Sequence, residues 1–204
     1  MANSQKSESS NSETSKSSTR SWSRWIDRIF LLLVIVLVAT GYWRNVQMAM
    51  IDVLTGGPKM EEDGSASLEE VDWNWQLRDL EGNFIKLADL RGEPLLINLW
   101  ATWCPPCRAE LPSIEKLHRD YGNEVKFLLI SGESSETLRR WTKDKSYELP
   151  FYRSAISSPQ VLSSTSIPAT FVIDREGNIR IIHKGAANWN SGKIRNLLDK
   201  LIAE

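Results

Sequence analysis

Cysteine and histidine are scarce in this sequence, with two of each among 204 residues. Cys104 and Cys107 are three positions apart, so they cannot join distant parts of the fold as structural disulfides do in small secreted domains. A structural zinc site needs four ligands, and the chain has no third cysteine; we expect His118 on a solvated helix surface and His183 near a strand end. No metal and no bound cofactor are therefore expected, which leaves redox chemistry or a chance pair.

An excess of charge of either sign is also missing. The 25 basic and 26 acidic residues give a formal net charge of -1. Nucleic-acid-binding proteins usually carry a basic patch or a strongly basic domain, so nucleic acid is not an expected partner. The length allows one well-buried domain with an accessory segment, but hardly two full domains.

The beginning of the chain has almost no apolar residues. Residues 1–23 contain ten serines and almost nothing apolar before Trp22. A segment of this composition cannot bury enough apolar surface to offset the entropy of folding. We therefore predict a disordered, serine-rich tail over residues 1–24.

An uncharged run follows the tail. Residues 29–43 carry no charge, lie between Arg28 and Arg44, and have aromatic residues at both ends. At about 1.5 Å per residue, this run is shorter than the roughly 30 Å hydrocarbon core of a bilayer, but interfacial aromatic residues and a snorkelling Arg28 lengthen the span. A transmembrane anchor over residues 25–44, a cleaved signal peptide and a buried core helix are three interpretations. The long tail and the mediocre cleavage site favour the anchor.

The charges on the two sides of the run predict its orientation. Basic residues precede it, whereas Glu61, Glu62 and Asp63 follow it. The positive-inside tendency places the tail in the cytoplasm. We expect a single-pass protein of the bacterial inner membrane whose C-terminal domain faces the periplasm or another extracytoplasmic space. Residues 45–70 are predicted to form a linker.

Residues 71–204 have the pattern of an α/β domain. Two short segments, 73–77 and 84–87, flank a turn sequence and predict a hairpin. Apolar runs predict further strands, and apolar residues at helical spacing predict helices. In chain order these are a strand at 94–100, a helix at 107–121, a strand at 125–130, a helix at 134–144, a short helix after Pro159, strands at 169–173 and 179–183, and a closing helix over 194–201. This order predicts a central mixed β-sheet flanked by helices on both faces.

The cysteine pair stands where a buried strand ends and a helix begins. In that position the first sulfur lies at the helix N-terminus, where free N–H groups and the macrodipole favour an anion. We therefore expect Cys104 to be the nucleophilic thiolate. Cys107 is expected to be less exposed and to attack the mixed disulfide formed on Cys104. Pro105 and Pro106 cost the helix little, but they remove two N–H donors that could solvate the thiolate.

The segment around the cysteines resembles a known family. The sequence NLWATWCPPCRAELP over residues 98–112 looks like the active-site segment of the TlpA/ResA/DsbE-like branch of the thioredoxin superfamily, and SIPATF over residues 166–171 resembles its second signature. The resemblance covers about residues 70–204 and implies a thioredoxin-like fold. It also implies a cis peptide bond at Ile167–Pro168 beside the cysteine pair, where an extended client segment can pair by strand addition. The alternative is that Pro168 simply begins an edge strand.

The resemblance also draws attention to Glu110, which matches an acidic residue that several members of the family use near the active site. A carboxylate there can take or give a proton during exchange, although the helix dipole alone favours a first-turn glutamate. Asn98 stands where cytosolic thioredoxins have a buried aspartate, and an asparagine cannot titrate. Glu110 is therefore the candidate for a proton relay. Trp100 and Trp103 are candidates for lining the client site, with plain packing as the alternative.

Taken with its predicted anchor, the resemblance implies an enzyme that reduces disulfides in extracytoplasmic client proteins, apocytochrome c during haem attachment being one case. A membrane electron donor would re-reduce it. The same exchange can run towards oxidation or isomerisation, because reduction potentials set its direction. A redox-sensing binding module is the alternative from another class. A peroxiredoxin is disfavoured, because the pair follows the strand at 94–100 and there is no separate peroxidatic cysteine.

Overall fold

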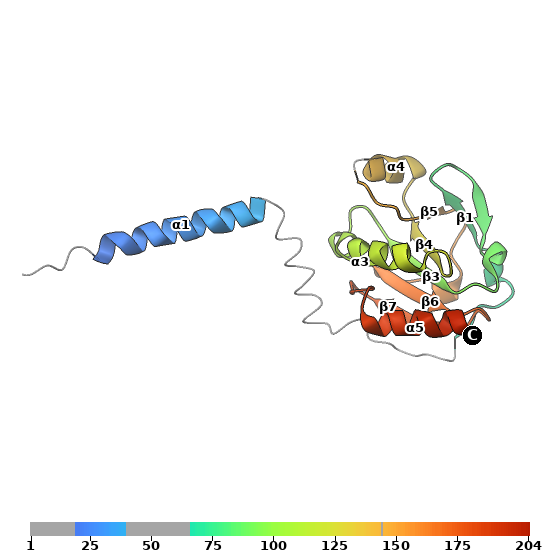
Figure 1. The fold of residues 1–204 in the computed structure, drawn as a ribbon. Helices are drawn as coiled ribbons and strands as arrows, with labels where there is room; N and C mark the ends of the chain where they lie inside the picture. Colours follow the sequence, from blue (N-terminus) through green and yellow to red (C-terminus); the bar gives the residue numbers. More distant parts are fainter. Residues whose placement is uncertain (1–18, 40–65, 144) are drawn as a thin grey trace, which may run out of the picture. The chain divides into compact units, whose positions relative to one another are not determined.

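The structure is a computed structural model that describes residues 19–39, 66–143 and 145–204. The chain divides into two units, Met1–Asn45 and Val46–Glu204. In the first unit, α1 spans Thr19–Ala39 (Figure 1). Ten large apolar side chains of this helix, from Trp25 to Val36, are exposed.

The predicted transmembrane span is not found among these residues. Within the three described ranges, no helix is both long enough and apolar enough to cross a bilayer. The last part of the expected anchor over residues 25–44, residues 40–44, lies outside the described ranges. The same holds for residues 1–18 of the predicted tail and for most of the predicted linker.

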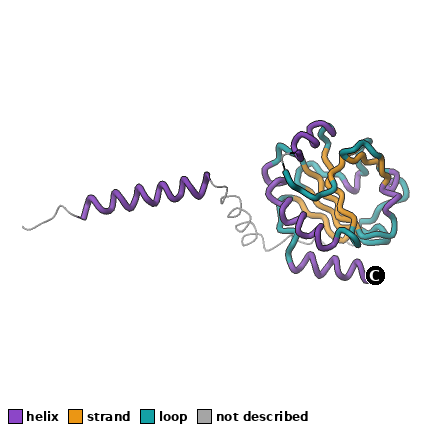
Figure 2. The backbone as a smooth tube through the Cα atoms, turned by 45° about the horizontal axis from the view of Figure 1, so that its top comes forward, coloured by secondary structure: helices purple, strands orange, loops and turns teal. Residues whose placement is uncertain are grey.

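The second unit is built on a seven-stranded mixed sheet with the strand order β2-β1-β5-β4-β3-β6-β7. The strands are β1 (Gln76–Asp79), β2 (Phe84–Lys86), β3 (Leu95–Trp100), β4 (Lys126–Ser131), β5 (Phe151–Ser154), β6 (Ala169–Ile173) and β7 (Ile179–Lys184). Strand β4 pairs in parallel with β3 and β5, and the other pairs are antiparallel. Figure 2 shows the strands running through the middle of this unit. Strands β3, β4 and β6 are almost wholly buried, as their continuous apolar runs predict.

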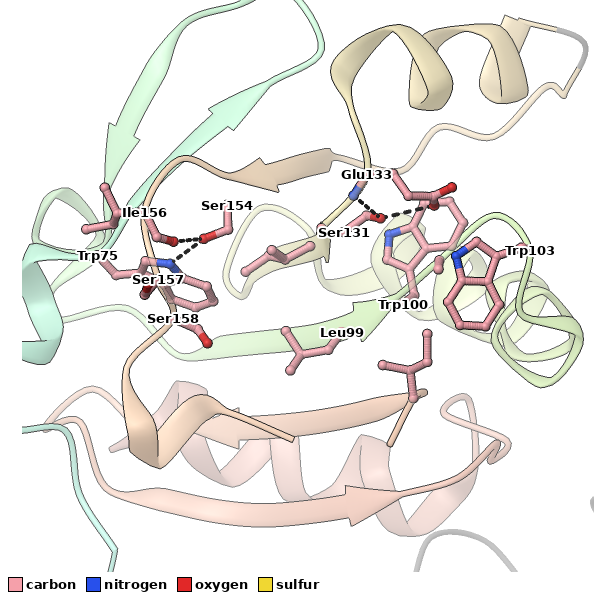
Figure 3. Close-up of a pocket in the computed structure, with 14 residues that line it drawn as sticks. Trp75, Leu99, Trp100, Trp103, Ser131, Glu133, Ser154, Ile156, Ser157 and Ser158 are labelled. Carbon is pink, nitrogen blue, oxygen red and sulfur yellow. Dashed lines mark hydrogen bonds between the residues drawn. The ribbon is translucent and has the colours of Figure 1, made fainter. Parts of the chain in front are cut away.

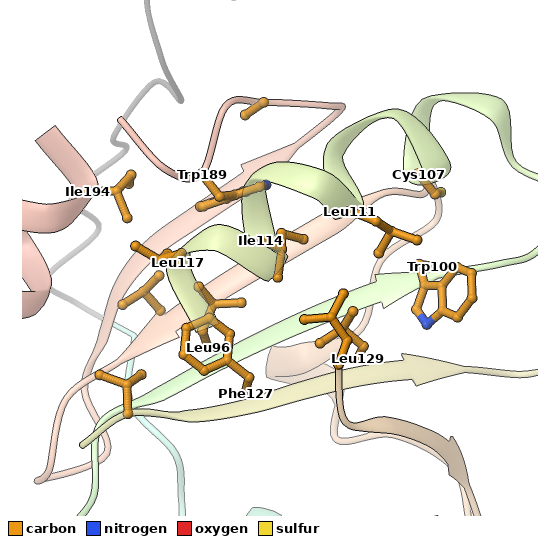
Figure 4. Packing of buried hydrophobic residues seen from close by; sticks show 14 of the residues in the cluster. Leu96, Trp100, Cys107, Leu111, Ile114, Leu117, Phe127, Leu129, Trp189 and Ile194 are labelled. Carbon is orange, nitrogen blue, oxygen red and sulfur yellow. The ribbon is translucent and has the colours of Figure 1, made fainter. Parts of the chain in front are cut away.

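The helices cover the two faces of the sheet unequally. The α-helices are α3 (Pro105–Tyr121), α4 (Ser135–Lys143) and α5 (Gly192–Ala203), and the short 3-10 helices are η1 (Asp72–Asn74), η2 (Leu87–Leu90) and η3 (Gln160–Leu162). Side chains of all three α-helices share one core cluster with Leu96, Trp100 and Leu129. Figure 4 shows the part of this cluster around α3. The opposite cluster, around Ile97 and Leu128, is covered by residues of the 3-10 helices.

The prediction of helices on both faces is therefore confirmed only in part. The three α-helices cover one face, and only short 3-10 helices cover the other. The reason lies in the order of the strands. The connections β3–α3–β4 and β4–α4–β5 step in the same direction along the sheet. Right-handed crossovers that step in one direction place their helices on one face, so α3 and α4 lie together.

Most of the predicted elements are confirmed, with three differences. Strand β5 was not predicted, because Phe151–Ser154 is short and has only one buried residue. The first strand of the N-terminal hairpin begins at Gln76, because the residues before it form η1. The helix after Pro159 is a single 3-10 turn.

The register of the sheet brings two distant segments together. Strand β3 pairs with β6 so that Leu99 lies opposite Ala169. The cysteine pair follows the end of β3, and Pro168 precedes the start of β6. Antiparallel pairing therefore places these two segments at the same edge of the sheet.

Candidate active site

The two cysteines form a disulfide at the beginning of α3. The Cys104–Cys107 bond has an S–S distance of 2.09 Å, and Cys104 is the N-cap of the helix. Pro105 and Pro106 have no N–H, so Cys107 supplies the first free N–H of α3, and it donates to Cys104 Sγ at 3.2 Å. In this oxidised form Cys104 is 3% exposed and Cys107 is 0% exposed. The difference in exposure has the expected direction but is small.

The segment before β6 lies beside the disulfide. The Ile167–Pro168 peptide bond is cis, and the Ile167 carbonyl oxygen is 3.9 Å from Cys104 Sγ. The Pro168 carbonyl accepts the Gly185 N–H at 2.9 Å, which fixes the segment to the end of β7. Pro168 does not begin an edge strand, because β6 lies between β3 and β7.

Glu110 lies one turn beyond Cys107 and is 1% exposed. It is in the second turn of α3, so it is not the exposed first-turn glutamate that the helix dipole favours. Its Oε1 accepts from Asn98 Nδ2 at 2.8 Å. Its Oε2 accepts from the Ala187 N–H at 3.2 Å and from Trp189 Nε1 at 2.9 Å.

Burial controls the titration of this carboxyl group. Loss of hydration raises the pKa of Glu110 to about 7, although the hydrogen bonds from Trp189, Asn98 and Ala187 act in the opposite direction. A pKa near 7 gives comparable populations of the acid and its conjugate base near neutral pH.

Asn98 belongs to the same polar cluster as Glu110. Its side chain is 0% exposed and also donates to Thr170 Oγ1 at 2.8 Å. Its Oδ1 has no hydrogen-bond partner among the residues that the structure describes. From the sequence, Asn98 was interpreted only as the loss of a buried acid, and Thr170 and Trp189 were not predicted to belong to the site. Asn98 and Thr170 stand in the two motifs, whereas no pattern marks Trp189.

A second carboxylate supports the segment that leads into the cysteine pair. Glu133 accepts the Thr102 N–H and the Thr102 hydroxyl, each at 2.7 Å, and the Ser131 hydroxyl at 3.2 Å. The loop between β4 and α4 is thereby fixed to the residues just before Cys104. Glu133 was not predicted from the sequence, because it lies far from the motif in the chain.

The two tryptophans near the pair differ in role. Trp100 is 2% exposed and packs against Trp141 and Phe151, with ring centroids 5.1 Å and 5.0 Å away. Trp103 is 70% exposed beside the disulfide. Both residues, together with Ile167, line a pocket (Figure 3).

Each of the two histidines packs against an aromatic ring. His118 is half-buried, and its ring meets that of Phe127 in a T-shaped contact with the ring centroids 5.0 Å apart. Burial lowers the pKa of His118, so the expectation of a solvated surface residue is wrong. His183 lies on β7 with its ring 5.7 Å from that of Trp189.

Among the residues that the structure describes, three acidic side chains have oxygens close enough to share a cation. Carboxylate oxygens of Asp174, Glu176 and Glu204 lie within 4.8 Å of one another. Asp174 already accepts from the backbone and side chain of Asn178 and from Arg180. Its charge is therefore neutralised within the protein.

Residues 71–182 match the AhpC/TSA family. The chain belongs to this family. Among its relatives, the thioredoxin-like protein YneN of Bacillus subtilis is 30% identical over 118 residues, which cover 55% of this chain and 68% of YneN. The thiol-disulfide oxidoreductase ResA of Bacillus cereus is 27% identical over 133 residues, covering 63% of this chain and 75% of ResA.

A solved structure gives the same result for the fold. A Bacteroides vulgatus protein described as a candidate thiol-disulfide oxidoreductase is 32% identical, with a TM-score of 0.54, over 62% of this chain and 91% of that chain. The predicted thioredoxin-like fold and the ResA-like resemblance are thus confirmed. This member of the AhpC/TSA family is a thiol–disulfide oxidoreductase with a Cys-x-x-Cys disulfide.

Proposed function

We propose that the protein reduces disulfides in extracytoplasmic client proteins, with Cys104 as the attacking thiolate and Cys107 as the resolving thiol. The position of Cys104 Sγ carries this proposal: it caps α3, accepts the Cys107 N–H at 3.2 Å and lies 3.9 Å from the Ile167 carbonyl oxygen. A helix N-terminus stabilises an anion at that place. The neighbouring backbone offers a docking edge for the client.

Two displacements complete the reaction. The Cys104 thiolate attacks one client sulfur, and the other client sulfur leaves as a thiolate and takes up a proton. Cys107 then loses its proton and attacks Cys104 Sγ, which expels the second client thiolate and forms the Cys104–Cys107 disulfide of the structure. The client gains two electrons, and a membrane electron donor as a second partner returns two electrons to the enzyme.

Glu110 is the proposed proton acceptor for the resolving step. It follows Cys107 by three positions on α3, so both residues lie on the same side of the helix. Its pKa of about 7 suits proton transfer near neutral pH. When Glu110 takes up a proton, Asn98 can rotate its amide so that Oδ1 accepts the new O–H. The buried cluster then keeps a hydrogen bond in either protonation state.

Ile167, Pro168 and Trp103 are the proposed client-binding residues. The Ile167 carbonyl oxygen beside the sulfur can accept an N–H from an extended client segment, as in strand addition. Buried Pro168 fixes the direction of that carbonyl. Exposed Trp103 offers an aromatic surface next to the disulfide.

The proposed location is the outer side of the bacterial inner membrane, with the N-terminal segment as a single-pass anchor. Two observations support it: residues 29–43 carry no charge, and the described apolar side chains of α1 are exposed. Apocytochrome c is a proposed client on the strength of the family resemblance. The cytoplasmic tail and the linker are parts of the same proposal.

Trapping of mixed disulfides tests the enzyme reaction. Cys107→Ser should accumulate clients covalently bound through Cys104, whereas the matched Cys104→Ser variant should accumulate none. Trapping of one or two clients supports a dedicated reductase, and many clients indicate a general oxidoreductase. An absence of adducts would mean that the cysteines serve as a switch in a binding module.

The direction of electron flow has its own test. The Cys104–Cys107 disulfide is equilibrated with glutathione buffers of known ratio, and the reduced fraction is measured by alkylation. A reduction potential below the glutathione couple supports a reductase. A potential well above it would make the enzyme an oxidase or isomerase instead.

A further inference from the structure

A pocket of about 520 Å³ opens beside the disulfide, at the ends of β3 and β4 (Figure 3). We call it the Trp75 pocket. Its apolar walls come from distant parts of the chain: Trp75, Leu99, Trp103, Ile130, Ile156 and Ile167. Its size lies in the range of sites that bind small molecules or side chains.

The Trp75 pocket is continuous with the exchange site. Trp103 directly precedes Cys104, and the carbonyl oxygen of Ile167 is 3.9 Å from Cys104 Sγ. Both residues also line the pocket. An extended chain advances about 3.3 Å per residue, so a client bonded to Cys104 has residues near its cysteine that reach the pocket.

Two polar groups in the pocket wall are already engaged within the protein, and the exposed Ser157 and Ser158 add two hydroxyl groups at its rim. Ser154 Oγ accepts from Trp75 Nε1 at 2.8 Å and donates to the Ile156 carbonyl. The Glu133 carboxylate accepts from Thr102 and Ser131. The remaining surface is mainly apolar, and the negative charge of Glu133 disfavours an anionic ligand.

We propose that the Trp75 pocket binds an apolar, preferably aromatic, side chain of the client polypeptide at a fixed distance from the reacting cysteine. This inference rests on the proposed function and adds a determinant of client choice. It also gives the N-terminal hairpin a role. Trp75, at the start of the hairpin, is fixed to β5 through Ser154 and forms one wall of the pocket.

Gly132 offers a way to fill the pocket. It lines the pocket, and a Cβ built on it meets no atom within 4 Å. Its φ is outside the left-handed region, so Gly132→Leu adds a side chain without backbone strain. Gly192 at the start of α5 has the same open space and ordinary φ but is not part of the pocket. Gly192→Leu is therefore the matched control.

The test measures exchange rates of the reduced, full-length protein. The probes are short glycine–serine peptides with one cysteine capped by thionitrobenzoate, and phenylalanine, serine or aspartate is placed at successive positions before and after the cysteine. A small capped thiol without a peptide reports the exchange chemistry alone. Release of thionitrobenzoate in a single turnover gives the second-order rate constant for each probe, which is the counterpart of kcat/KM.

The proposal predicts a preference for phenylalanine over serine of about 10-fold or more at one or two positions, since one methylene in an apolar pocket already changes kcat/KM by about that factor. Aspartate at those positions should be the poorest probe. Gly132→Leu should reduce the phenylalanine-to-serine ratio to near one, and Gly192→Leu should keep it.

Other outcomes overturn the proposal in distinguishable ways. Equal rates for all peptides, or the same preference at every position, would mean that the pocket selects nothing. A ratio that Gly132→Leu leaves unchanged would place the selectivity elsewhere. If neither the peptides nor the small capped thiol react, the proposed function itself is wrong.

Discussion

At the residue scale, Glu110 is the clearest sign that the buried polar cluster serves chemistry. A carboxyl group that is 1% exposed loses its hydration, and its three donors offset that loss only in part, so its pKa rises to about 7. Between pH 4.5, where an ordinary glutamate titrates, and pH 7, the folded protein retains a proton that the unfolded chain has lost. The free energy of unfolding therefore falls as pH rises through this window.

Glu110→Gln should remove this pH dependence. The wild-type protein should lose on the order of 3 kcal/mol of stability relative to the variant between pH 4.5 and 7, because each unit of pKa shift corresponds to about 1.4 kcal/mol. Urea unfolding of the oxidised proteins at several pH values measures it. The exposed Glu124→Gln should keep the wild-type slope, and an equal slope in all three proteins would disprove the assignment.

The same variant tests the proton relay. If Glu110 accepts the proton of the resolving step, the rate of client release should show an inflection near pH 7 that Glu110→Gln lacks. The measurement is a single-turnover rate from a preformed mixed disulfide across pH 5.5–8.5. A variant with an unchanged pH–rate profile would remove Glu110 from the mechanism.

Glu133 carries a different prediction. Glu133→Ala removes the acceptor of the partly buried Thr102 N–H and hydroxyl, and the loss should cost about 1–3 kcal/mol of stability. Chemical unfolding measures the cost. Glu136→Ala, which breaks an exposed ion pair on α4, should change stability by less than about 1 kcal/mol. Equal losses in the two variants would mean that Glu133 does not support the segment before Cys104.

At the element scale, the N-terminus of α3 sets the environment of Cys104. A helix N-cap normally accepts from the second or third residue of the helix. Here the second residue is Pro106, which has no N–H, so only Cys107 donates. The helix therefore stabilises the Cys104 thiolate less than it could.

Pro106→Ala should make the enzyme more oxidising. The added N–H stabilises the thiolate of the reduced form, so the reduction potential should rise by roughly 30 mV, which corresponds to about 1.4 kcal/mol. Equilibration with glutathione measures the shift. Pro112→Ala changes a proline in the interior of the same helix and should leave the potential unchanged. Equal shifts in both variants would assign the effect to helix stability instead.

Elements with a strong apolar pattern were predictable from the sequence, and contacts between elements were not. Strand β3 and helix α3 follow from apolar periodicity, and the two motifs indicated the meeting of Cys104 with Ile167. Strand β5 has no apolar run, because half-buried Tyr152 and Arg153 occupy its middle. The hydrogen bond from Trp189 to Glu110 joins residues 79 positions apart, and no motif near Trp189 in the sequence predicts it.

At the scale of the whole molecule, the chain combines a folded domain with a helix whose described side chains, those of residues 25–36, are exposed. The exposed apolar side chains of α1 between Trp25 and Val36 form a larger apolar surface than soluble monomers usually show. A surface of this kind needs a cover of lipid or protein. In the proposed anchor the lipid of the bilayer covers this surface. The absence of charge over residues 29–43 fits that position.

The full-length protein should therefore remain with the membrane fraction after washes with high salt and alkaline carbonate, because these remove proteins held by charge or by other proteins. Leu32→Asp places a carboxylate in the middle of α1. A charge at the centre of a transmembrane helix makes the free energy of membrane insertion less favourable by about 2.5–3.5 kcal/mol, so this variant should be released in part. Lys193→Asp, at an exposed position of α5, is the control and should release none. Complete release of the wild-type protein by salt alone would show that α1 is covered by something other than the bilayer.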